Sequence, residues 1–106
     1  MGYSITMRVE KTDDYRDWLD SLKDLHGRAR ILMRVDRLIH GNPGLHRNLT
    51  GGVSELKIDF GPGYRVYYTQ PGNHLLLLLI GGDKSSQDRD IAKAIRLATQ
   101  FQELKP

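Results

Sequence analysis

Cysteine and long hydrophobic runs are both missing from this chain of 106 residues. Without cysteine the chain forms neither disulfide bonds nor thiolate metal sites, which fits the cytoplasm. The longest apolar run, residues 75–80, falls far short of the roughly 18 residues that span a bilayer. Residues 1–12 hold no apolar core typical of a secretory signal. We therefore expect a cytoplasmic protein with no membrane partner.

Patterns that hold cofactors and metal ions are missing too. Gly81 and Gly82 stand next to each other without the Gly-x-Gly-x-x-Gly pattern of nucleotide-binding turns. The sequence has four histidines, and no two of them have the spacing of metal ligands: His26, His40, His46 and His74. We expect no cofactor and no metal site.

The length and charge of the chain limit the number of domains and the kinds of partner that we expect. A chain of 106 residues suits one domain, residues 1–106, and its 39% of hydrophobic residues allow a modest core. The net charge is +3 and the sequence pI is about 9.3. This excess favours acidic partners, such as nucleic acid or an acidic protein.

The first half of the chain predicts one strand and two helices. Residues 4–9 alternate as a strand, and Thr12 or Asp13 can cap the helix that follows. One apolar stripe at helical spacing marks that helix: Tyr15, Trp18, Leu19 and Leu22. Gly27 separates it from a second helix over residues 28–40, which ends at a Gly-Asn-Pro-Gly stop. We expect the two helices to pack as an antiparallel hairpin.

The second half predicts a meander of strands and a last helix. Residues 45–52 are predicted to be a loop, and strands follow at residues 53–60, 64–70 and 74–80, joined by glycine- and proline-rich turns. Ser85 or Ser86 can cap a helix with one buried stripe: Ile91, Ala94, Ile95, Ala98 and Phe101. The fold class is α+β, in the order strand, helix, helix, three-stranded antiparallel meander, C-terminal helix.

Pairing the first two meander strands across a three-residue turn predicts which side chains share a face. Asp59 then lies opposite Arg65, and Lys57 lies opposite Tyr67. The apolar face holds Leu56, Ile58, Phe60, Tyr64, Val66 and Tyr68. The other face, which we expect to be open to solvent, holds Glu55, Lys57, Asp59, Arg65 and Tyr67. That face is either an ordinary wet sheet surface with an Asp59–Arg65 ion pair, or an RNA surface on which Tyr67 stacks on a base.

Two glycine-rich stretches, residues 51–68 (GGVSELKIDFGPGYRVYY) and 78–87 (LLIGGDKSSQ), carry a resemblance to a known family. They resemble the hallmark of phage-derived HigB-like addiction module killer proteins, within the RelE/ParE toxin superfamily. The resemblance implies a RelE-like fold and a toxin of a type II toxin–antitoxin pair. Many such relatives cleave mRNA on the translating ribosome and are silenced by a cognate antitoxin, often a helix-turn-helix protein. ParE-type relatives instead inhibit DNA gyrase, and an inactive RNA-binding remnant is a third possibility.

Metal-free RNA cleavage needs a base for the 2′-hydroxyl, cations for the phosphate and an acid for the leaving 5′-oxygen. We expect Arg65 to bind the phosphate, because the arginine fork matches phosphate oxygens and stays charged; the alternative is the structural pair with Asp59. Either Lys57 or Glu55 takes the proton. Lys84 contacts the phosphate or the leaving group, or else sits in water while Asp83 and Ser85 cap the helix.

Basic residues outside the meander are further candidates for RNA contact. Arg30, Arg34 and Arg37 fall at i, i+4 and i+7 on one face of the second predicted helix. They form either plain helix surface or a contact to ribosomal RNA. His46, just before the first meander strand, is either an ordinary surface histidine or, beside Arg47, a contact to RNA.

Overall fold

The computed structural model describes residues 7–103, which form an α+β fold with a five-stranded mixed sheet and three α-helices. Along the chain the elements are β1 (Arg8–Lys11), α1 (Asp13–Ser21), α2 (Leu25–Ile39), β2 (His46–Asn48), β3 (Val53–Ile58), β4 (Tyr64–Thr69), β5 (Leu75–Asp83), the 3-10 turn η1 (Lys84–Ser86) and α3 (Gln87–Glu103). The predicted element order is confirmed. One strand, β2, lies in the region that the sequence predicts to be a loop, and residues 4–6 of the predicted first strand lie outside the described residues.

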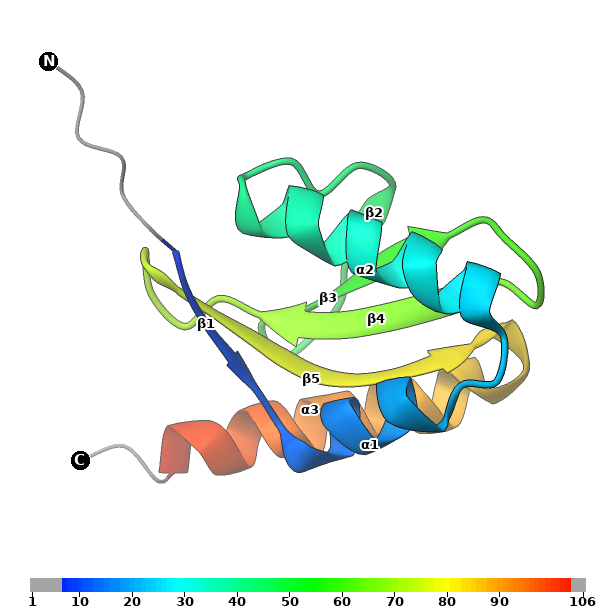
Figure 1. Ribbon diagram of the computed structural model, residues 1–106. Helices are drawn as coiled ribbons and strands as arrows, with labels where there is room; N and C mark the ends of the chain where they lie inside the picture. The colour runs from blue at the N-terminus through cyan, green and yellow to red at the C-terminus, as the bar shows by residue number, and fades with distance from the viewer. Residues whose placement is uncertain (1–6, 104–106) are drawn as a thin grey trace, which may run out of the picture.

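The strands lie in the order β1-β5-β4-β3-β2, with β1 parallel to β5 and the other neighbours antiparallel. Helix α2 lies on one face of the sheet and α3 lies on the other, while α1 runs beside β5 (Figure 1). The sheet is therefore the middle of three layers. None of the helices between Met7 and Glu103 is long and apolar enough to cross a membrane.

Each face of the sheet has its own hydrophobic core. Under α1 and α2 the buried side chains are Tyr15, Leu19, Ile31, Val35, Leu38, Leu56, Ile58, Tyr64, Val66, Tyr68, Leu76 and Leu78. Under α3 they are Val53, Tyr67, Leu77, Leu79, Ile80, Ala94 and Ala98. The predicted apolar face of the hairpin and the predicted stripe of the last helix are both confirmed. The alternating side chains of a strand let one sheet serve both cores.

The first helix begins where the sequence predicts, because the Thr12 side chain accepts a hydrogen bond from the backbone N–H of Tyr15, at 2.9 Å. Gly27 does not separate the two helices, so that prediction is wrong. Asp24 caps α2 and accepts from the Gly27 N–H at 2.9 Å, so Gly27 belongs to the first turn of the helix. Glycine is needed there because a Cβ would collide with the Tyr64 ring. The predicted helical hairpin is also absent, since α1 packs mainly on β5 and α2 on β3 and β4.

Strand β5 continues past the predicted end at residue 80 and includes the pair Gly81–Gly82. A Cβ at Gly81 would collide with the Trp18 ring of α1, and a Cβ at Gly82 would collide with the Asp90 carboxylate of α3. The two glycines therefore let α1 and α3 approach the strand closely. The chain then turns into η1, which Asp83 caps by accepting from the Ser85 N–H at 2.8 Å. Asp83, rather than Ser85 or Ser86, is the cap.

The β3–β4 hairpin has a longer connection than the sequence predicts. Ile58 pairs with Tyr64, Lys57 with Arg65, and Glu55 with Tyr67. The connection therefore spans residues 59–63 instead of 61–63, and the predicted pairing is wrong by two positions. A shift of two keeps every side chain on its predicted face. The predicted Asp59–Arg65 pair is replaced by two cations, Lys57 and Arg65, lying directly across from each other.

Candidate functional site

The sheet face that carries Glu55, Lys57, Arg65 and Tyr67 is the face on which α3 packs. Helix α3 covers the end that holds Glu55 and Tyr67, both of which are fully buried. It leaves the end with Lys57 and Arg65 partly exposed. The prediction of a face open to solvent is therefore wrong for one end and right for the other.

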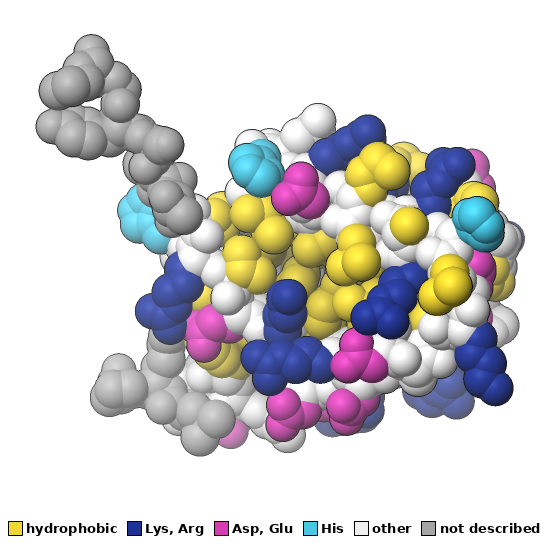
Figure 2. All heavy atoms as spheres, in the orientation of Figure 1, with side chains coloured by type: hydrophobic (Ala, Val, Ile, Leu, Met, Phe, Trp, Pro, Cys, Tyr) yellow, Lys and Arg dark blue, Asp and Glu magenta, His cyan; other side chains and the backbone are white. Residues whose placement is uncertain are grey.

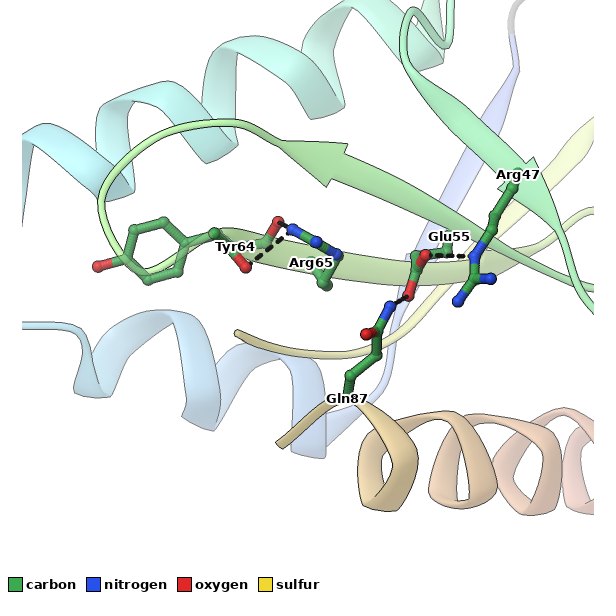
Figure 3. Close-up of polar contacts among 6 residues, drawn as sticks. Arg47, Glu55, Tyr64, Arg65 and Gln87 are labelled. Carbon is green, nitrogen blue, oxygen red and sulfur yellow. Dashed lines mark hydrogen bonds and ion pairs between the residues drawn. The ribbon is translucent and has the colours of Figure 1, made fainter. Parts of the chain in front are cut away.

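At the covered end, Glu55 is a buried carboxylate held by two donors. The Nε of Arg47 on β2 donates to Oε1 at 2.8 Å, and the Nε2 of Gln87 at the start of α3 donates to Oε2 at 2.9 Å (Figure 3). Burial raises the pKa of Glu55, but these hydrogen bonds outweigh burial and the pKa lies below its usual value. With both oxygens occupied and no contact with solvent, Glu55 joins β2, β3 and α3. The prediction of Glu55 as the base is not supported by this position.

Tyr67 lies beside Glu55 and is equally inaccessible. Its side chain is 0% exposed and belongs to the core beneath α3. Burial raises the pKa of its hydroxyl, and the neighbouring Glu55 carboxylate raises it further. A base cannot stack on a ring that is covered on both sides, so the predicted stacking role of Tyr67 is wrong.

At the open end, a surface pocket of about 320 Å³ brings together three of the predicted catalytic residues. Lys57 comes from β3, Arg65 from β4, and Lys84 from the first position of η1. The pocket is lined by Leu45, Lys57, Asp59, Gly61, Pro62, Gly63, Arg65 and Lys84. Among these lining residues there are three cations and one carboxylate. Neither Lys57 nor Lys84 forms an ion pair with any residue of the described range.

The Arg65 guanidinium has two hydrogen bonds to the hairpin connection and one buried nitrogen without a partner in the described range. Its Nη1 donates to the carbonyl oxygens of Gly63 at 2.9 Å and Tyr64 at 3.1 Å, which turns the guanidinium back over the hairpin connection (Figure 3). Its Nε is buried and has no hydrogen-bond partner among residues 7–103. A buried donor without a partner costs about 1–3 kcal/mol.

The predicted arginine stripe on α2 divides into different roles. Arg34 donates to the backbone oxygens of Lys57 at 2.6 Å and of Pro43 and Leu45 at 2.9 Å each, so it ties the approach to β2 onto β3. Arg30 lies over the Phe60 ring, 4.9 Å from its centroid. Arg37 is exposed and donates to the sulfur of Met33 at 3.9 Å. Arg30 and Arg37 remain available for RNA contact, whereas Arg34 is occupied by the protein backbone.

His46 and Arg47 point to opposite faces of β2. Arg47 shares the face of Glu55, its cross-strand partner, and remains about half exposed while it pairs with that carboxylate. His46 lies opposite Leu56, and its Nδ1 is 2.8 Å from the Gly44 carbonyl oxygen. The two side chains therefore project from opposite sides of the edge strand β2. Over residues 7–103, no group of three or more His, Asp or Glu side chains is placed to hold a metal ion.

A larger pocket, of about 590 Å³, lies between α1 and α3. Some of its charged residues have partners: the Lys93 Nζ is 3.2 Å from the Asp14 Oδ1, and the Ser86 hydroxyl donates to the Asp90 carboxylate. Its lining also mixes acidic and basic residues. Acidic and basic side chains likewise alternate over the surface seen in Figure 2, without one basic patch. The smaller pocket is the better candidate site for an anionic ligand, because cations outnumber carboxylates among its lining residues and do not in the larger pocket.

Comparison with known proteins gives one informative match. An uncharacterized protein of Haemophilus influenzae is 43% identical over 97 residues, which cover 92% of this chain and 98% of that protein. No family model matches the chain.

Proposed function

We infer that this chain, which belongs to one protein family with the uncharacterized Haemophilus influenzae protein, is a toxin of a type II toxin–antitoxin pair. Its proposed activity is cleavage of mRNA on the ribosome by amino-acid side chains alone. The observation that carries this proposal is the meeting of Lys57, Arg65 and Lys84 in one pocket. A cognate antitoxin, of the helix-turn-helix class, is the proposed inhibitor.

Cleavage of a phosphodiester builds negative charge on the phosphate, and fixed cations in a pocket stabilise that charge. The Arg65 guanidinium is prepared for this role, because its contacts to the turn hold it in place. Lys57 and Arg65 lie directly opposite each other, which is unfavourable for a sheet unless an anion lies between or above them. This pair of cations favours binding of an RNA backbone and does not stabilise the fold.

The fold supports the same proposal. The resemblance of the two glycine-rich stretches implies a RelE-like fold, and the α+β sheet with its antiparallel meander and C-terminal helix agrees with that element order. We propose that the fold is RelE-like in this finer sense. The pocket lies at the end of the meander, where both stretches meet: residues 57–65 come from the first and Lys84 from the second.

The test is growth arrest and mRNA cleavage in cells that express the protein. Primer extension should reveal cuts that require translation, and Arg65→Ala should lower the cleavage rate about 10²- to 10³-fold, as expected for loss of a preorganised charge-stabilising group. Arg16→Ala, which removes an exposed arginine in a surface pair with Asp13, is the matched control and should keep full activity.

Two results would contradict the proposal. Equal cleavage by Arg65→Ala, with the fold intact by circular dichroism, would remove the pocket from the mechanism. Intact mRNA together with inhibition of purified DNA gyrase in a supercoiling assay would replace RNA cleavage by a protein-binding activity. Absence of any growth arrest would indicate an inactive remnant.

A further inference from the structure

Asp59 is the one carboxylate among the residues that line the candidate pocket. It follows directly after β3, at the first position of the five-residue connection to β4. Its side chain is exposed and forms no ion pair or hydrogen bond with any residue of the described range. The register explains this freedom, because Arg65 lies across from Lys57 and donates to the turn instead of to Asp59.

No other group in the pocket is suited to accept a proton. Lysine and arginine side chains carry hydrogen-bond donors and no acceptor, which describes Lys57, Arg65 and Lys84. Glu55, the nearest carboxylate along the strand, is sealed beneath α3 with both oxygens occupied. His46 does not line the pocket and projects from the other face of the sheet.

We propose that Asp59 is the catalytic base of RNA cleavage, a role that rests on the proposed function. Its carboxylate takes the proton of the 2′-hydroxyl as that oxygen attacks phosphorus. The bond between phosphorus and the 5′-oxygen breaks, and the leaving oxygen takes a proton from the Lys84 ammonium. The products are a 2′,3′-cyclic phosphate and a 5′-hydroxyl end. Asp59 and Lys84 then return to their starting states by proton exchange with water.

Cations lie on both sides of Asp59. Lys57, Arg65 and Lys84 share the candidate pocket with it. On the other side, Asp59 also lines a pocket of about 230 Å³ that contains three arginines of α2: Arg30, Arg34 and Arg37. The Asp59 carboxylate therefore lies among cations that can bind a substrate phosphate. Substrate phosphate bound to the same cations would place the 2′-hydroxyl within its reach.

The experiment compares Asp59→Asn with the wild-type chain in single-turnover cleavage of a defined mRNA on purified bacterial ribosomes, at a series of pH values. Wild-type cleavage should fall as the pH drops and the base becomes protonated. In Asp59→Asn the rate constant should fall at least 10²-fold, and this acidic limb should disappear. Binding of the same mRNA with a 2′-deoxy nucleotide at the cleavage site should be unchanged or tighter, because a negative charge is removed. Asp59→Glu should retain the acidic limb.

Asp36→Asn is the matched control, since Asp36 is exposed on α2, away from the candidate pocket, and the substitution changes the net charge equally. It should cleave as the wild type does. If the wild type cleaves and Asp59→Asn keeps both its rate and its acidic limb, the assignment of Asp59 is wrong while the proposed function stands. If the wild type cleaves no mRNA, the proposed function itself fails.

Discussion

The two ends of one sheet face carry charged side chains from the same two strands, β3 and β4, and they differ in what surrounds those charges. At the covered end, Glu55 is buried and receives hydrogen bonds from Arg47 and Gln87. At the open end, Lys57 and Arg65 lie next to each other with no carboxylate bound between them. Glu55 and Lys57 are only two positions apart along β3.

The difference separates a structural charge from a functional one. A buried charge is tolerated when it is paired and fully hydrogen-bonded, and it then holds elements together. Like charges opposite each other in a sheet destabilise it. Their presence at the open end therefore indicates a role other than stabilising the fold. The covered end should therefore control stability, and the open end should control RNA binding.

Glu55→Ala should produce the largest effect on the fold. The substitution removes both hydrogen bonds to Glu55 and leaves a cavity beneath α3, so the free energy of unfolding should fall by about 3 kcal/mol. Urea unfolding followed by circular dichroism measures the change. Asp59→Ala, on an exposed residue at the open end, should alter the same free energy by less than about 0.5 kcal/mol. Equal losses in the two variants would abolish the distinction between the ends.

Lys57→Ala should show the reverse pattern, with a smaller effect. RNA affinity should fall up to about tenfold, and the salt dependence of binding should drop by about one phosphate contact. Stability should stay constant or rise slightly, because the repulsion with Arg65 is relieved. Fluorescence anisotropy with a labelled single-stranded RNA at several salt concentrations measures both binding quantities.

Lys11→Ala, at an exposed lysine on β1, is the charge-matched control and should bind as the wild type does. A similar loss of affinity in both variants would show that net charge, and not the pocket, governs binding.

A still smaller effect is expected on the pH dependence of the free energy of unfolding, through the ionisation of Glu55. Its pKa in the folded protein lies below the usual value, so its ionised form stabilises the fold above the unfolded-state pKa of about 4.3. That contribution is lost as the pH falls through the folded-state pKa. The stability advantage of the wild type over Glu55→Gln should thus shrink when urea unfolding is repeated from pH 6 down to pH 3. Asp24 and Asp83, whose pKa values are also lowered, are present in both proteins and cancel. An advantage that does not change with pH would show that Glu55 is not ionised in the fold.

The alternation of side chains predicts which residues share a face, but not which residues pair. Lys57 and Arg65 lie on one face in both the predicted and the observed register, because the two registers differ by an even number of positions. The turn chemistry of Gly61-Pro62-Gly63 indicates a tight connection. It carries no sign that Asp59 and Phe60 also leave the strand, and so the partner of Arg65 could not be predicted.

The cover over Glu55 and Tyr67 was harder to predict from the hairpin alone. Two signals for it are nonetheless present in the sequence. The six apolar residues at 75–80 have no polar alternation, which is typical of a strand buried on both faces. The apolar stripe of α3 also needs a sheet face to cover. Strand β2 has no comparable signal, because its three residues, His46–Asn48, are all polar and exposed.

The three hydrogen bonds of Arg34 have a mechanical consequence. They join α2 to the backbone of Leu45 and Lys57, whose side chains form part of the pocket wall. Arg34 therefore couples α2 to the backbone of that wall. The position of the pocket wall relative to α2 thus depends partly on a residue that has no part in the lining of the pocket.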